Sequence, residues 1–147
     1  MTRSPPTPTR LSSATILVVD DEVSLRHLLV RQLQSNGYTV LEAGYGMQAL
    51  EVARASPEPI HLVLSDIRMP GMLGTELARR LVAEHPDVRV VLMSAHPIDE
   101  LKSVSDSRGI IQVLPKPFDG QTMLAVVKLV LGGAPAEADP STAGVSR

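Results

Sequence analysis

The sequence predicts an α/β protein with an open parallel sheet built from five strand–helix units. Short runs rich in Val, Ile and Leu alternate along the chain with longer stretches in which apolar residues recur every three or four positions. This alternation is typical of parallel strands joined by right-handed helical crossovers. Five units are too few to close an eight-stranded barrel, so we expect an open sheet.

Short apolar runs mark the predicted strands. In chain order they are TILVVD (15–20), YTVLEA (38–43), HLVLSD (61–66), VRVVLM (88–93) and IIQVL (110–114). Four of these runs are nearly continuous, as expected for strands that helices cover on both faces of a sheet. The run at 38–43 alternates apolar and polar residues more strictly, which predicts an edge strand.

Amphipathic stretches mark the predicted helices. The first is expected to end at Asn36-Gly37 and the last at Gly132-Gly133, because glycine favours a helix C-terminus. A further, weaker helix is expected at 98–107, where serines and aspartates interrupt the pattern. The four clear apolar stripes are Leu25, Leu28, Leu29 and Leu33; Met47, Leu50 and Ala53; Leu73, Leu77 and Leu81; and Met123, Val126, Val127 and Val130.

The 147 residues suit one domain, expected at 15–131. Residues 1–14, rich in Pro, Ser and Thr, predict a flexible leader, and residues 132–147 a disordered tail or linker. No secretory signal is predicted, and no apolar run approaches the ~20 residues of a membrane helix. We therefore expect a cytoplasmic protein that does not contact a membrane.

Composition excludes several classes of site. Lys and Arg number 14 against 16 Asp and Glu, so the sequence lacks the basic excess of a nucleic-acid binder. The absence of cysteine excludes disulfides, zinc–thiolate sites and thiol catalysis. Aromatic residues make up only 2%, too few for a surface that stacks nucleic-acid bases.

Polar residues follow most of the predicted strands, at the edge where open parallel sheets carry their chemistry. They are Asp20-Asp21, Asp66, Ser94 and Lys116. Three carboxylates in one pocket repel each other, and Mg²⁺ would relieve that repulsion because it prefers oxygen ligands. A cation and a lysine together suit a phosphoryl group, and an aspartate can accept one as an aspartyl-phosphate.

The central position of Asp66 makes it the best candidate acceptor. Asp20 and Asp21 would then hold the metal, while Lys116 and the Ser94 hydroxyl would contact phosphoryl oxygens.

Four segments in order, ILVVDDE, LSDIRMPGM, VLMSAHP and LPKPF, resemble the landmark segments of receiver domains of two-component response regulators. The intervals also agree: 46 residues from Asp20 to Asp66, 28 from Asp66 to Ser94, and 22 from Ser94 to Lys116. The resemblance covers residues 15–131. It implies a flavodoxin-like (βα)5 doubly wound parallel sheet of strand order 2-1-3-4-5.

The resemblance also implies a site and partners. Mg²⁺ is expected on Asp21, Asp66 and the backbone carbonyl of Arg68, with Asp20 acting through water. Asp66 is expected to take a phosphoryl group from a sensor histidine kinase or a histidine phosphotransfer protein. Such a domain is a phosphorylation switch that catalyses its own phosphorylation and slow dephosphorylation, and is not an enzyme acting on a substrate. The downstream protein would bind the face of the fourth helix, fifth strand and fifth helix, and the Lys116–Pro117 peptide bond would be cis.

The sequence departs from the family pattern at two positions. Val113 stands where members of the family commonly carry an aromatic ring that swings inward on activation. By resemblance, receivers that lack this ring are common in hybrid histidine kinases. Leu73 replaces an acid, so the third helix is expected to lack a side-chain N-cap and to begin more loosely.

Other functions are open on the sequence alone. One is a receiver fold that docks a partner constitutively, and another is an aspartyl-phosphate phosphatase, although Asp20 and Asp21 are adjacent where a phosphatase needs D-x-D. The segment Gly44–Ala49 fits a dinucleotide-binding G-x-G-x-x-A, but it follows the edge strand, where a tight turn is the simpler reading. The four histidines lack ligand spacing. His96 and Arg68 are candidates for tuning how fast water reaches the phosphoryl group.

Overall fold

The computed structural model describes residues 14–96 and 109–132. The predicted leader (1–14, except Ala14), the predicted helix at 98–107 and the predicted tail (132–147, except Gly132) lie outside the described residues. The elements follow in the order β1 (Thr15–Val19), α2 (Val23–Ser35), β2 (Thr39–Ala43), α3 (Gly46–Ala55), β3 (Leu62–Asp66), α4 (Gly74–Glu84), β4 (Arg89–Ser94), β5 (Ile110–Pro115) and α6 (Gly120–Gly132).

The strands form a five-stranded parallel sheet of order β2-β1-β3-β4-β5, which confirms the predicted topology. The chain first adds β2 outside β1 and then crosses back to place β3 on the other side. Strand order therefore reverses between β1 and β3, and in such sheets that reversal marks the binding edge. The predicted edge strand is confirmed, because β2 ends the sheet and is only partly buried.

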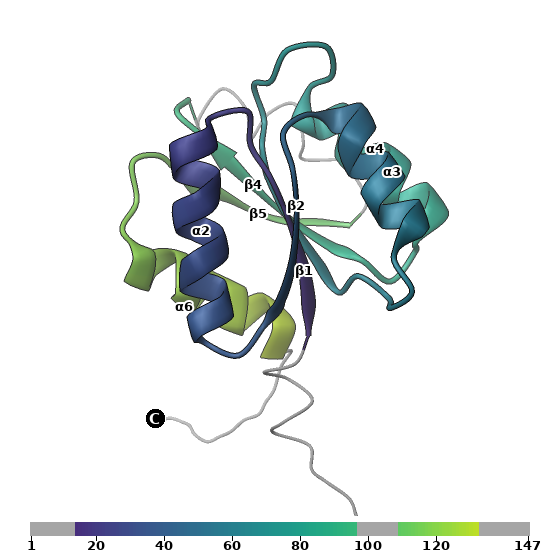
Figure 1. Ribbon diagram of the computed structural model, residues 1–147. Coiled ribbons are helices and arrows are strands. Elements are labelled where there is room, and N and C mark those ends of the chain that lie inside the picture. Colours follow the sequence, from purple (N-terminus) through teal and green to yellow (C-terminus); the bar gives the residue numbers. More distant parts are fainter. Residues whose placement is uncertain (1–13, 97–108, 133–147) are drawn as a thin grey trace, which may run out of the picture.

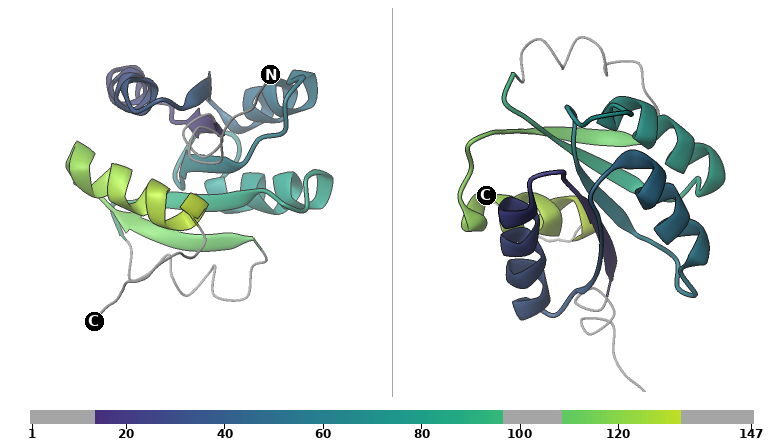
Figure 2. Two further views of the ribbon diagram at one scale, coloured as in Figure 1. Left: turned by 90° about the horizontal axis from the view of Figure 1, so that it is seen from below. Right: turned by 45° about the horizontal axis from the view of Figure 1, so that its top comes forward.

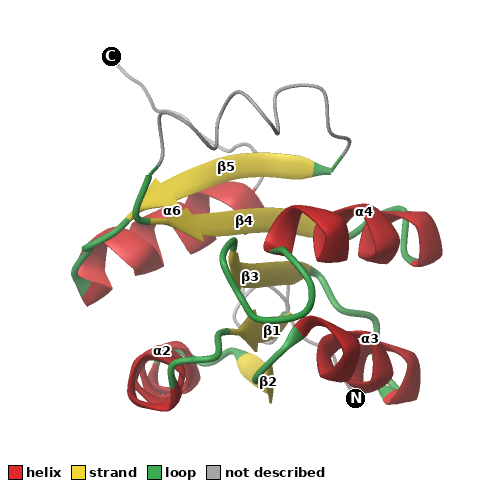
Figure 3. Cartoon of the chain, turned by 90° about the horizontal axis from the view of Figure 1, so that it is seen from above, coloured by secondary structure: helices red, strands yellow, loops and turns green. Residues whose placement is uncertain are grey.

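Helices cover both faces of the sheet. Figures 1 and 3 show α2 and α6 on one face and α3 and α4 on the other. Figure 2, in its view from below, shows the sheet between these two layers. Because the strands are parallel, the polar residues that follow them lie at one edge of the sheet; Figure 3 shows the arrowheads of β4 and β5 on the same side.

The core lies in two clusters, one on each face of the sheet. Along β1, Leu17 and Val19 join the cluster beneath α3 and α4, whereas Ile16 and Val18 join the cluster beneath α2 and α6. Every residue of β1 is buried. Alternate burial on two faces explains why the central strands are nearly continuous apolar runs.

The predicted helical stripes are wrong at three positions. Leu28, Met47 and Leu73 are exposed by 53%, 49% and 52%. In α2 the buried face includes Val30 in place of Leu28. Leu73 precedes the first turn of α4, where the stripe has not yet begun, and it makes no side-chain cap, as expected.

Two local features agree with the sequence-based expectations. Helix α2 ends at Ser35, and Gly37 follows with a positive φ of 93°, a conformation that glycine adopts without strain. The Lys116–Pro117 peptide bond is cis. None of the helices in the described ranges combines the length and the apolar character that a membrane crossing requires.

Candidate functional site

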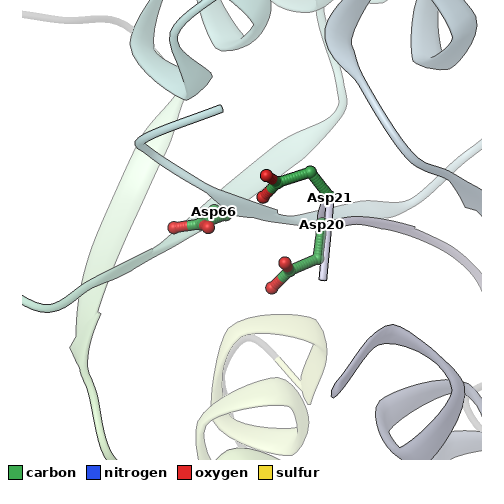
Figure 4. Close-up of side chains that lie close together, drawn as sticks. All are labelled: Asp20, Asp21 and Asp66. Atoms are coloured by element: carbon green, nitrogen blue, oxygen red, sulfur yellow. The ribbon is translucent and has the colours of Figure 1, made fainter. Parts of the chain in front are cut away.

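Three predicted carboxylates meet at the carboxyl edge of the sheet. Asp20 and Asp21 follow β1, and Asp66 ends the neighbouring strand β3. One ligand oxygen from each of the three lies within 4.8 Å of the others. Figure 4 shows the three side chains pointing to the same side of the strand ends. The expectation that strand ends bring these acids together is therefore met by the geometry.

Asp20 is a fully buried carboxylate with one satisfied oxygen. Its Oδ1 accepts a hydrogen bond of 2.8 Å from the backbone N–H of Glu22, whereas its Oδ2 has no hydrogen-bond partner. The Lys116 Nζ lies 3.6 Å from Oδ2. Burial raises the pKa of Asp20, against the lowering by the Glu22 N–H and by Lys116. Asp20 is thus a buried acid whose ionised form a further cation would stabilise.

Asp66 is the second acid that Lys116 contacts. The Lys116 Nζ lies 3.4 Å from Asp66 Oδ2, and the Asp66 side chain is 13% exposed. Burial raises the pKa of Asp66, while the charge of Lys116 and a hydrogen bond from the Arg68 backbone N–H oppose the rise. The carboxylate is accordingly mostly enclosed, flanked by a cation, and keeps a small exposed surface.

Ser94 and Lys116 are joined through the backbone at the ends of β4 and β5. The Lys116 N–H donates to the Ser94 carbonyl oxygen at 2.7 Å. The Ser94 side chain is buried, and its Oγ accepts a hydrogen bond of 2.9 Å from the His96 N–H. A hydroxyl can accept one hydrogen bond and donate another, so the Ser94 proton is not committed by this contact.

Two contributors to this edge were missed by the sequence reasoning. The Arg26 side chain, on α2, donates from Nη1 to the Asp20 carbonyl oxygen and from Nε to Glu42, both at 2.9 Å. Gly74 allows α4 to begin against the backbone of β3, because a Cβ there would lie 2.2 Å from the Asp66 carbonyl oxygen. The only sequence signals were an arginine six residues after Asp20 and a glycine eight residues after Asp66.

The donor set fits a hard divalent cation. All three clustered groups are carboxylates, two of them have pKa values raised by burial, and Asp20 Oδ2 is buried without a hydrogen bond. A divalent cation held directly or through its water would meet each of these needs. The exposed Arg68, whose carbonyl was the fourth predicted ligand, lies two residues after Asp66, in the loop that follows β3.

Comparison with known proteins decides the family. The response regulator receiver domain model matches residues 16–128. The chain belongs to the receiver domain family. Its curated relatives include the sensor kinase CckA of Brucella abortus, 39% identical over 81% of this chain, but the chain spans only 13% of that kinase. They also include sporulation initiation phosphotransferase F of Bacillus subtilis, 35% identical over 79% of this chain and 92% of that protein.

A solved structure of a response regulator agrees with this chain in fold. The response regulator TrrA of Thermotoga maritima, crystallised in complex with Mg²⁺ and BeF, is 32% identical, with a TM-score of 0.69 over 80% of this chain and 98% of that one. Receiver domains of this kind are phosphorylation switches. The chain is a phosphoacceptor receiver domain of a two-component phosphorelay.

Proposed function

We propose that Asp66 is the residue that accepts the phosphoryl group. One observation carries the proposal: Asp66 is the carboxylate that lies both in the acidic cluster and beside Lys116 at the end of the central strand β3 while keeping exposed surface. Asp20 is fully buried and so cannot be approached in line by a donor. Asp21 is exposed, but the described contacts of Lys116 are to Asp20 and Asp66.

The reaction is an in-line transfer from phosphohistidine. An Asp66 carboxylate oxygen forms a bond to phosphorus as the P–N bond breaks, and the electron pair of that bond returns to the imidazole nitrogen. Lys116 favours the ionised form of Asp66 and pairs with a phosphoryl oxygen after transfer. Ser94 donates its hydroxyl proton to another phosphoryl oxygen.

The metal site in this proposal uses Asp21, Asp66 and the Arg68 carbonyl, with Asp20 acting through water. Bound Mg²⁺ would supply positive charge that the crowded oxygens of the transferred group require. The chain's own residues orient Asp66, the acceptor, and limit the access of water to it. Slow attack by water on the acyl phosphate then releases phosphate and returns Asp66 to its free state. Arg68 and His96 are both exposed and follow Asp66 and Ser94 by two residues, and they are the residues proposed to set that rate.

The proposed partners are a sensor histidine kinase or a histidine phosphotransfer protein upstream and a protein downstream. The downstream face comprises β5, α6 and the segment at 98–107, of which the last lies outside the described residues. Val113 of β5 packs partly buried against the α3–α4 cluster. Without an aromatic ring at Val113, switching is proposed to pass through the Ser94 and Lys116 backbones, which are hydrogen-bonded to each other.

Beryllofluoride, a mimic of the phosphoryl group, tests this function. With Mg²⁺ we expect specific changes in the backbone NMR spectrum of the unaltered chain and of the control Asp87→Asn, in which an exposed acid before β4 is neutralised. Asp66→Asn should show none. A folded, unaltered chain that does not respond would overturn the proposal in favour of constitutive docking, and a response retained by Asp66→Asn would overturn the assignment of Asp66.

A further inference from the structure

Arg26 ties the end of β1 to the edge strand. Its side chain is only 16% exposed and forms an ion pair with Glu42 of β2 while also donating to the Asp20 carbonyl oxygen. Glu42 lies opposite Val18 in the β1–β2 register. Arg26 therefore bridges helix α2, strand β2 and the first residue beyond β1, and its planar guanidinium can serve both acceptors at once.

The bond to the Asp20 carbonyl acts on Asp21 through one peptide plane. The Asp20 carbonyl and the Asp21 N–H belong to the same rigid peptide unit. On the other side of Asp21, the Glu22 N–H is held by Asp20 Oδ1 at 2.8 Å. Both peptide units that flank Asp21 are thus fixed, one by Arg26 and one by Asp20, and together they restrict where the exposed Asp21 carboxylate can lie.

We propose that Arg26 is a positioning residue that fixes the peptide between Asp20 and Asp21 and thereby sets the geometry in which their carboxylates take a divalent cation. The inference rests on the proposed function of this edge as a Mg²⁺ site. It assigns to Arg26 a role in metal affinity that acts through the backbone and not through direct contact with the metal.

The positive charge of Arg26 would itself change Mg²⁺ binding, in the direction opposite to the proposed positioning effect. A guanidinium near a cation site repels the cation, so removing its charge alone would tighten Mg²⁺ binding. Loss of a positioning contact would weaken binding, typically by 10–100-fold when a partner of a ligand is removed. The two explanations therefore predict changes of opposite sign.

Two further variants remove the ambiguity of charge. The double variant Arg26→Met with Glu42→Gln removes one charge of each sign, so the net charge beside the site is unchanged. Gly44→Ala keeps every charge but places a Cβ 3.0 Å from Arg26 Nη1, so the guanidinium must move by a few tenths of an ångström. Arg31→Met, an exposed arginine on the same helix, is the matched control.

The experiment measures the Kd of Mg²⁺ by calorimetry and the urea midpoint of each metal-free variant. We expect Arg26→Met and the double variant to bind Mg²⁺ about tenfold more weakly, Arg26→Lys and Gly44→Ala to show smaller losses, and Arg31→Met to match the unaltered chain. Should Arg26→Met fail to fold, Arg26→Lys and Gly44→Ala carry the same test, because both keep the positive charge.

Three results would overturn the inference. Equal or tighter Mg²⁺ binding by folded Arg26→Met contradicts it, as does a lowered urea midpoint with an unchanged Kd, which is the signature of a merely structural role. An unaltered chain that does not bind Mg²⁺ overturns the proposed metal site and this inference with it. The first two results leave the proposed function standing, so the two failures are distinguishable.

Discussion

At the scale of single residues, burial of acids governs the site. Burial raises the pKa of Asp66 even though Lys116 lies 3.4 Å away. The folded chain thus holds the Asp66 proton more strongly than the unfolded chain does. The stability that this provides is complete below the ordinary pKa of an aspartate and is lost as the pH rises through the raised pKa.

A pH series on Asp66→Asn tests that sign. Because Asn does not ionise, the stability of Asp66→Asn relative to the unaltered chain should increase between about pH 4 and pH 7. Urea unfolding without divalent cations measures the difference at each pH. A difference that is constant or shrinks with rising pH would contradict the burial argument, and Asp87→Asn, at an exposed site, controls for the loss of one acid.

The shared position of the acids and the lysine was predictable, because a parallel sheet brings the carboxyl ends of its strands to one edge. Once five parallel strands were predicted, Asp20, Asp66 and Lys116 had to lie at one edge. The role of Arg26 was not predictable in this way. It depends on the β1–β2 register that places Glu42 opposite Val18, two residues before Asp20, and nothing local to Arg26 encodes that register.

At the scale of elements, adjacent leucines in α2 have opposite environments. Leu29 is 1% exposed and packs beneath the helix, whereas Leu28 is 53% exposed. We predict that Leu29→Ala lowers the free energy of unfolding by about 2–5 kcal/mol, because it leaves a cavity in the core. Leu28→Ala should change it by less than about 0.5 kcal/mol. Chemical denaturation of both variants checks this, and similar losses would contradict the orientation of α2.

The start of α4 depends on a close backbone approach. Gly74 donates its N–H to the Ile67 carbonyl at 2.7 Å, and a Cβ would collide with the Asp66 carbonyl. Gly74→Ala should therefore cost about 1–3 kcal/mol of stability, displace the loop after Asp66 and weaken beryllofluoride binding. Gly132→Ala, where an added Cβ meets nothing within 4 Å, is the control. Wild-type stability and ligand response in Gly74→Ala would show that the contact is unimportant.

Helix positions were predictable from periodicity, but their exact faces were not. The i, i+3, i+4 pattern predicted Leu28 on the buried side of α2, whereas in the folded chain Val30 is buried there and Leu28 is exposed. Met47 stands in the first turn of α3 and Leu73 just before α4, and both side chains are exposed although the glycines next to them are buried. Periodicity alone does not show which side of a helix faces the sheet when apolar residues stand on more than one side.

At the scale of the whole molecule, ligand binding and folding are linked. The acidic cluster forms only when β1 and β3 are paired, so the cation should bind the folded chain alone. At a free Mg²⁺ concentration 100 times its Kd, the free energy of unfolding should rise by about 2.7 kcal/mol.

Denaturation with and without Mg²⁺ measures this linkage, and a chelator should reverse it. Asp21→Asn should lose most of the gain, whereas Asp87→Asn should keep it. Equal stabilisation of all three chains would indicate a general salt effect and would contradict a site at the carboxyl edge.

The direct test of the account is phosphotransfer onto a single residue. The unaltered chain, Asp66→Asn and Asp87→Asn are each mixed with phosphorylated sensor kinases or histidine phosphotransfer proteins and Mg²⁺, and the modified residue is mapped by mass spectrometry. The account predicts one phosphoryl group on Asp66 in the unaltered chain and in Asp87→Asn, and none in Asp66→Asn. Phosphorylation of Asp66→Asn to the same extent, or of the unaltered chain at another residue, would contradict it.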